Sequence, residues 1–242
     1  MILRVAFWLT LAVVASPALA GPPFVSDDPE PTPYKHFEIY TFTEGHNTRE
    51  GTSGSGGVDF NYGAGPDLQL TATLPIGYEA MATGRARVGL SNVELAAKYR
   101  FLHQANFGWD VAIFPRMFLP SGSAVGDRSP SLLLPIWGQR DLGNGWTTFG
   151  GGGCLLSAAG IAQNSCIAGW VVTRELSKNL HVGAEVFHQT SSAASPATTS
   201  LGVGVTYDIN DNYHLLGYVR RGIQNTEETD RVSWYAAVLF TF

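Results

Sequence analysis

Apolar and polar residues alternate one by one along much of this chain. In the segment 67–74, every even-numbered residue is apolar and every odd-numbered residue is polar or charged. A period of two places these two sets on opposite faces of a β-strand. The alternation recurs in about twelve segments, and helical periodicity competes with it only within residues 1–20. The predicted strands lie near residues 35–43, 56–63, 66–76, 89–102, 106–119, 130–140, 145–157, 164–176, 179–190, 197–208, 213–222 and 232–242.

The connections between these segments alternate between short and long. Antiparallel strands with short turns at one end and long loops at the other are typical of outer-membrane barrels. A soluble sandwich has no reason to separate its loop lengths in this way, and a lipocalin-like barrel has about eight strands with its apolar face inside. The short turns are predicted at 63–65, 103–105, 141–144, 177–178 and 209–212, and the long loops at 44–55, 77–88, 120–129, 158–163, 191–196 and 223–231.

The predicted fold class is therefore all-β: a transmembrane, antiparallel, up-and-down β-barrel of about twelve strands over residues 35–242. Small and polar residues are expected inside, and the aromatic-rich face outside. An even number of strands brings both termini to the short-turn end, which faces the periplasm in such barrels. The composition has no long apolar runs for a helical membrane bundle, and a net charge of −5 offers no basic surface for nucleic acid.

Both ends of the chain carry signals for export and assembly. Arg4, an apolar core and a small-residue cleavage site ending at Ala20 predict a signal peptide over residues 1–20. The last residues, with Val238, Phe240 and Phe242 at alternate positions, resemble the C-terminal strand that the outer-membrane assembly machinery of bacteria recognises. We therefore expect the mature protein in the bacterial outer membrane, in contact with its lipid.

The stretch between the signal peptide and the first strand, residues 21–34, contains five prolines and three acidic residues. Such a stretch cannot pair as a central strand, because proline lacks the N–H that a ladder requires. Two alternatives are open. It is either a loose periplasmic leader or a plug that folds into the lumen.

Several charged residues fall on the polar faces of the predicted strands. Facing lipid would cost several kcal/mol for each charge near the midplane, so these side chains are expected to point into the lumen. They either form a structural network or line a mixed-charge constriction in a pore. The predicted constriction consists of Glu94, Lys98, Arg116 and Glu185, with Asp67, Arg100 and Asp110 as secondary lumen charges.

The two cysteines of the sequence, Cys154 and Cys166, lie on consecutive predicted strands. Their numbers sum to 320, so a hairpin folded symmetrically about Gly160 places them opposite each other. Directly opposed residues on antiparallel strands come within reach of a disulfide, and export permits one to form.

Catalytic motifs are absent from the sequence: there is no Gly-x-Ser-x-Gly, His-Glu-x-x-His, P-loop or Cys-x-x-Cys. The one enzymatic alternative is a lipid hydrolase in which His188 activates Ser191 or Ser192. The six histidines show no metal-ligand spacing. We therefore predict neither a metal nor a cofactor, and expect the protein not to be an enzyme.

Several motifs together resemble one protein family. They are the opening Pro-Pro-Phe-Val-Ser-Asp-Asp-Pro-Glu of residues 22–30, Gly-Leu-Ser-Asn-Val-Glu-Leu at 89–95, Lys-Tyr-Arg-Phe at 98–101, Phe-Pro-Arg at 114–116, Leu-Pro-Ser-Gly at 119–122, Trp-Thr-Thr-Phe-Gly-Gly-Gly-Gly at 146–153 and Gly-Ala-Glu-Val-Phe-His-Gln-Thr at 183–190. The chain is similar to the outer-membrane proteins of the meta-pathway phenol-degradation family, often described as transporters. The two cysteines depart from that pattern.

This resemblance implies a Gram-negative outer-membrane barrel, sometimes encoded beside aromatic-degradation genes. It favours a channel for passive uptake of small solutes, including aromatic or poorly polar compounds. The alternative is a closed barrel with a structural or lipid-modifying role.

Overall fold

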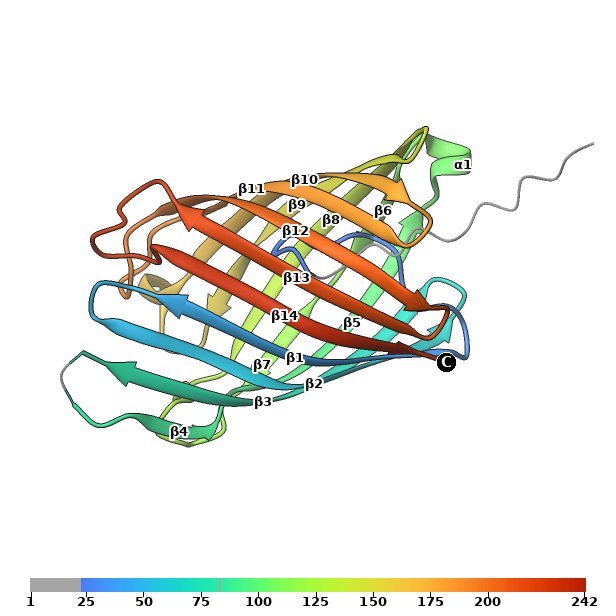
Figure 1. The fold of residues 1–242 in the computed structure, drawn as a ribbon. Coiled ribbons are helices and arrows are strands. Elements are labelled where there is room, and N and C mark those ends of the chain that lie inside the picture. Colours follow the sequence, from blue (N-terminus) through green and yellow to red (C-terminus); the bar gives the residue numbers. More distant parts are fainter. Residues whose placement is uncertain (1–22, 83) are drawn as a thin grey trace, which may run out of the picture.

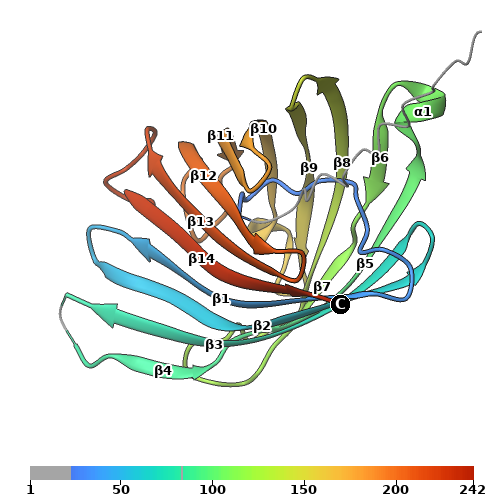
Figure 2. The same cartoon turned by 45° about the vertical axis from the view of Figure 1, so that its right-hand side comes forward.

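The computed structural model describes residues 23–82 and 84–242, so the predicted signal peptide lies outside the described residues. The described chain forms one antiparallel sheet that closes where β1 pairs with β14 (Figure 1, Figure 2). Among these residues, no helix has both the length and the apolar character needed to cross a membrane. The strands are β1 (Phe37–Asn47), β2 (Gly51–Gly65), β3 (Leu68–Met81), β4 (Arg87–Leu90), β5 (Val93–Leu102), β6 (Asp110–Ile113), β7 (Arg116–Leu119), β8 (Ser131–Gly143), β9 (Trp146–Ser157), β10 (Ser165–Ser177), β11 (Leu180–Gln189), β12 (Thr198–Asn210), β13 (Tyr213–Gly222) and β14 (Val232–Thr241).

Two of the transmembrane strands are interrupted. β4 and β5 both pair with β3, and β6 and β7 both lie between β5 and β8, so each pair is one broken strand. The 14 segments therefore make 12 transmembrane strands (14 − 2), which confirms the predicted number. The second break falls at Pro115, which has no N–H for the ladder, although its carbonyl still accepts a hydrogen bond from Ala97 N at 3.2 Å.

The alternating pattern places its two faces as predicted. In β3, Gln69 and Thr71 are buried in the interior, whereas Leu70 and Leu74 are 48% and 50% exposed on the outside. Exposed leucines at alternate positions form the apolar outer band that a transmembrane barrel presents to lipid. The described chain is a β-barrel of the transmembrane type.

Three of the predicted connections are wrong in length. β3 extends to Met81 and β4 begins at Arg87, so only residues 82–86 of the predicted loop 77–88 connect these two strands. β1 and β2 extend through most of the predicted loop 44–55 and leave only residues 48–50 as the turn. The Gly/Ser-rich sequence reads as a loop but is strand, because small residues let neighbouring strands approach. A Cβ on Gly54 would lie 2.2 Å from the carbonyl oxygen of Glu44. At the other end, the predicted short turn 103–105 contains a helical turn, α1 (Gln104–Phe107).

Around much of the barrel, the connections at one end are short and those at the other end are long. Two-residue turns join β8 to β9, β10 to β11 and β12 to β13, whereas the connections after β7, β9, β11 and β13 are longer. Figure 1 shows the C-terminus at the end that carries the short turns. That end is therefore also where β1 begins.

The interior is less polar than the sequence predicts. Tyr40, Leu216, Ala237 and Leu239 form a buried apolar cluster on the inner faces of β1, β13 and β14. Aromatic rings point inward here because these strands carry apolar residues on both faces. The lumen thus contains an apolar cluster among polar side chains such as His214 and Ser233.

Candidate functional site

The segment before β1 lies inside the barrel. Ser26, Asp28 and Thr32 are buried, at 0%, 0% and 1% exposure. Figure 2 shows this segment as a blue trace running within the ring of strands before it joins β1. The residues that contact it come from strands on opposite sides of the ring, so this segment, residues 23–33, crosses the lumen. We call it the lumen segment.

Lys98 on β5 holds the middle of the lumen segment. Its ammonium lies 3.0 Å from an Asp27 carboxylate oxygen and 3.8 Å from one of Asp28, and donates a hydrogen bond to the Glu30 carbonyl at 3.3 Å. The Lys98 side chain is 5% exposed. A buried ammonium needs such partners, because desolvation without them is costly. Lys98 is therefore a site of attachment for the lumen segment.

Glu185 on β11 holds the segment from another part of the wall. Its carboxylate accepts backbone hydrogen bonds from Ser26 N at 2.6 Å and Val25 N at 3.3 Å, and the Tyr218 hydroxyl also donates to it. A carboxylate that accepts several donors can stay charged in a buried place. Glu185 thus binds the backbone of the lumen segment rather than any side chain of it.

Glu94 and Arg116 form a third arrangement, independent of the first two. Two parallel hydrogen bonds of 2.7 and 2.8 Å join the Arg116 guanidinium to the Glu94 carboxylate across β5 and β7. The guanidinium also lies over the Phe114 and Phe118 rings. The four residues predicted as one constriction therefore divide into a wall pair and two attachment sites for the lumen segment.

The secondary charges gather near the short-turn end. Arg100 lies between two carboxylates, 3.1 Å from Asp67 and 3.9 Å from Asp110. Asp110 also accepts a hydrogen bond from Gln104 N at 3.0 Å, which fixes the start of the helical turn α1. These three residues form a network that ties neighbouring strands together.

Several residues of the site escaped the sequence prediction. Thr32 donates from its backbone N–H to the Gln69 amide oxygen at 2.8 Å and from its hydroxyl to Glu38 at 3.1 Å. Gln139 donates its amide N–H to Glu30 at 2.9 Å. The available signal was the acidic character of residues 27–30, which matches the single lysine on the inner face of β5.

The two acids at the centre of the lumen segment have altered proton affinities. Burial raises the pKa of Glu30 to about 7, and nearby Asp110 acts in the same direction, while Arg100 and Lys98 oppose them. Burial also raises the pKa of Asp28 well above its ordinary value, against the charge of Lys98. Protonation of Glu30 therefore falls near neutral pH.

Beyond the lumen segment the barrel keeps a cavity of about 420 Å³. Its lining includes polar groups such as Asp59, Glu94 and Asn61 and the rings of Phe42 and Tyr235. The last two rings stack with centroids 6.1 Å apart. This cavity therefore offers both hydrogen-bonding groups and aromatic rings to a small solute.

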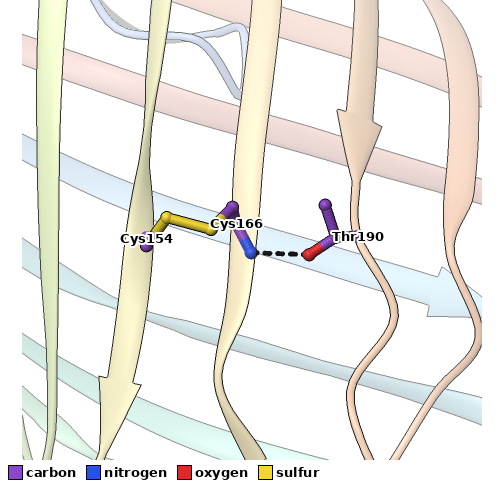
Figure 3. The surroundings of a disulfide bond; sticks show 3 residues. All are labelled: Cys154, Cys166 and Thr190. Atoms are coloured by element: carbon purple, nitrogen blue, oxygen red, sulfur yellow. Dashed lines mark hydrogen bonds between the residues drawn. A yellow bond between two sulfur atoms is a disulfide. The ribbon is translucent and has the colours of Figure 1, made fainter.

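The two cysteines are joined on the outside of the barrel. Cys154 and Cys166 face each other in the register of β9 and β10 and form a disulfide, with their Cα atoms 3.9 Å apart (Figure 3). The N–H of Cys166 also donates to the Thr190 hydroxyl at 2.8 Å. The disulfide links β9 to β10 covalently near the end of this hairpin and lies away from the lumen.

The residues of the hydrolase alternative do not form a dyad. The His188 Nδ1 lies 2.9 Å from the Thr199 hydroxyl. Within residues 23–82 and 84–242, no hydrogen bond joins His188 to Ser191 or Ser192. The same part of the chain contains no group of three or more His, Cys, Asp or Glu side chains arranged to hold a metal ion.

The C-terminal row predicted as an assembly signal lies on β14 and just after it. Phe240 pairs with Ile39 of β1 in the closing contact of the barrel. Phe242 is 59% exposed and stacks on Phe37, with ring centroids 5.8 Å apart. The row, which includes Val238, thus lies on the outer face at the seam between first and last strands.

Comparisons with known proteins agree with this architecture. A family model described as "Putative MetA-pathway of phenol degradation" matches residues 35–235. No curated relative matches the sequence.

Solved structures share the fold at low sequence identity. The COG4313 outer membrane channel from Pseudomonas putida F1 is 15% identical, with a TM-score of 0.75 over 89% of this chain and 98% of that one. The KdgM porin in complex with disordered oligogalacturonate is 8% identical, with a TM-score of 0.59 over 86% and 99%. The translocator domain of the autotransporter NalP from Neisseria meningitidis is 12% identical, with a TM-score of 0.53 over 86% and 88%.

Proposed function

This chain belongs to the MetA-pathway phenol-degradation family, and we propose that it is an outer-membrane channel for passive uptake of small solutes. The lumen segment is the plug of this channel. The observation that carries the proposal is the cavity of about 420 Å³ that ends on a segment held by a few ionic and hydrogen-bonded contacts. A barrel that served only as a scaffold would not need a separate segment across its lumen.

The solute class follows from the mixed lining of the cavity. An aromatic molecule can contact the Phe42 and Tyr235 rings, while its hydroxyl groups bond to Asp59 or Asn61 nearby. The family name also points to phenolic compounds. We therefore propose small aromatic or poorly polar solutes, which cross by brief contacts with these rings and polar groups.

The orientation of the barrel is part of the same proposal. Short turns face the periplasm in bacterial barrels, so both termini are placed there. The lumen segment then closes the lumen from the periplasmic side, and the cavity opens toward the longer loops. The outer row of Val238, Phe240 and Phe242 is proposed to contact the assembly machinery before the barrel closes.

Single-channel recording with phenol as a probe tests the proposed solute class. Phenol in the cavity should interrupt the ionic current in a concentration-dependent way, whereas glucose at equal concentration should not. Phe42→Leu, which keeps an apolar side chain but removes the ring, should weaken the block. Equal block by both solutes would contradict an aromatic site, and no current under any condition would favour the closed barrel.

A further inference from the structure

The outer wall of the barrel contains an apolar groove of about 840 Å³ across β10 to β13. Its floor lies where outward-facing residues are small, at Ala184 and Gly217, and valines form its sides. The register aligns these residues in two neighbouring rows across the strands: Val172, Ala184, Val203 and Val219 in one, and Arg174, Val182, Val205 and Gly217 in the other.

The short-turn end of this groove is basic. Arg174 and Trp146 line the groove, and the Arg174 guanidinium lies 5.0 Å from the centre of the Trp146 ring. It also donates a hydrogen bond to the carbonyl of Asn144 in the β8–β9 turn. A lipid-facing arginine is tolerated only near the membrane surface, where its head group reaches polar atoms. Arg174 therefore lies at the level of the lipid head groups.

The guanidinium of Arg174 carries more N–H donors than the carbonyl of Asn144 can accept. Among the described residues, no carboxylate lies within 4.0 Å of its guanidinium, unlike Arg100 or Arg116 inside the barrel. A guanidinium presents five N–H groups in a fork that matches the oxygens of a phosphate. An anionic phosphate is thus the complementary group at this end of the groove, and hydrocarbon is complementary to the rest.

A second arginine on the same outer face provides a comparison. Arg140 on β8 lies 6.0 Å from the centre of the Trp109 ring. It is exposed, but it does not line the groove. A general band of aromatic and basic residues would include both pairs, whereas a built binding site would depend on Arg174 alone.

We propose that this groove binds one phospholipid molecule of the leaflet at the short-turn end. The phosphate contacts Arg174 beside Trp146, and an acyl chain lies along Ala184 and Gly217. The occupant is a phospholipid rather than lipopolysaccharide, because the short turns of such barrels face the periplasmic leaflet. The site is separate from the lumen, and its leaflet assignment rests on the orientation proposed above.

Native mass spectrometry of the purified full barrel in detergent tests this site with added phosphatidylethanolamine. The wild type should retain one lipid. Diacylglycerol with the same acyl chains, and inorganic phosphate, should each bind at least about tenfold more weakly, since each lacks half of the interactions. Equal retention of diacylglycerol would overturn the role of the phosphate, and displacement of the lipid by lipopolysaccharide would overturn the assigned leaflet.

Substitutions distinguish a specific lipid-binding site from nonspecific contact with lipid. Arg174→Gln should lower retention about tenfold, the effect expected for loss of a charge-assisted hydrogen bond, and Arg174→Lys should restore most of it. Gly217→Leu should also lower retention. A Cβ at Gly217 would lie 3.6 Å from Val205, so the larger residue fills the groove without displacing the backbone. Arg140→Gln is the matched control and should bind as the wild type does.

Correct folding of each variant is established by its unboiled mobility on a denaturing gel. If Arg140→Gln and Arg174→Gln weaken retention equally, the groove is part of a general band and the proposal fails. Unchanged retention in folded Gly217→Leu would equally contradict it.

Discussion

The two attachments of the lumen segment use different chemistry. Lys98 binds the side chains of Asp27 and Asp28, so that contact depends on which residues the segment carries. Glu185 binds the backbone N–H groups of Val25 and Ser26, so it depends on the local conformation and tolerates changes of side chain. The lumen segment is thus held by charge at Asp27 and Asp28 and by backbone conformation at Val25 and Ser26, and each attachment can be broken without the other.

The largest increase in open probability is expected when Lys98, the charge-dependent attachment, is replaced. Lys98→Met leaves two carboxylates buried without a cation, which costs about 3–5 kcal/mol for a buried pair. The lumen segment should therefore leave the lumen, and single-channel recording should show at least a tenfold higher open probability. Combining the change with Asp27→Asn and Asp28→Asn should restore closure. An open probability unchanged in folded Lys98→Met would show that Lys98 does not hold the segment.

A smaller increase in open probability is expected when Glu185, which binds the backbone of the lumen segment, is replaced. Glu185→Gln keeps one acceptor oxygen but loses the charge that strengthens the bonds from Ser26, Val25 and Tyr218, a loss of about 1.5–3 kcal/mol. The open probability should rise less than in Lys98→Met. Tyr218→Phe is the matched control, because it removes one donor and leaves both backbone contacts.

Closure by the lumen segment should also depend on pH. The pKa of Glu30 is raised to about 7, so the seated segment binds a proton more tightly than the free one does. The stabilisation is complete below the ordinary glutamate pKa and is lost as pH rises through about 7. Conductance should therefore increase between pH 5 and pH 8. Glu30→Gln should flatten this dependence, and a profile that falls with rising pH would contradict the sign.

The smallest effect on channel closure is expected at the wall pair of Glu94 and Arg116, which does not contact the lumen segment. Replacing Glu94 by glutamine removes one negative charge and leaves Arg116 without its charged partner. Ion selectivity, measured as a reversal potential in a salt gradient, should shift toward anions while the barrel stays assembled. Unchanged selectivity in the assembled Glu94→Gln variant would place the narrowest part of the pore elsewhere.

The barrel could be predicted well from the sequence because the residues that identify each strand are neighbours in the sequence. Alternation in segments such as 67–74 identifies a strand and its two faces without any knowledge of neighbours. The opposed positions of Cys154 and Cys166 follow from the symmetry of one hairpin. The Gly/Ser-rich run after Gly51 was misjudged, because composition does not show how closely two strands approach.

The site was harder to predict because its partners are distant in sequence. Lys98 and Glu185 were recognised as lumen residues, but nothing local shows that they bind residues 25–28 across the lumen. The inner apolar cluster around Tyr40 and Leu239 was missed for the same reason. Strand periodicity gives the face on which a residue lies, whereas its contact across the barrel depends on closure.

A reversible cross-link tests the central claim, that residues 23–33 close the lumen. A Cβ on Gly169 would lie 3.3 Å from the Ser26 Cβ, so cysteines at these two positions are within reach of a disulfide. In the Ser26→Cys, Gly169→Cys variant carrying Lys98→Met, oxidation should abolish the single-channel current and reductant should restore it. Lys98→Met alone, which keeps the native disulfide, should conduct in both conditions. Equal conductance of the cross-linked and reduced channels would contradict the claim.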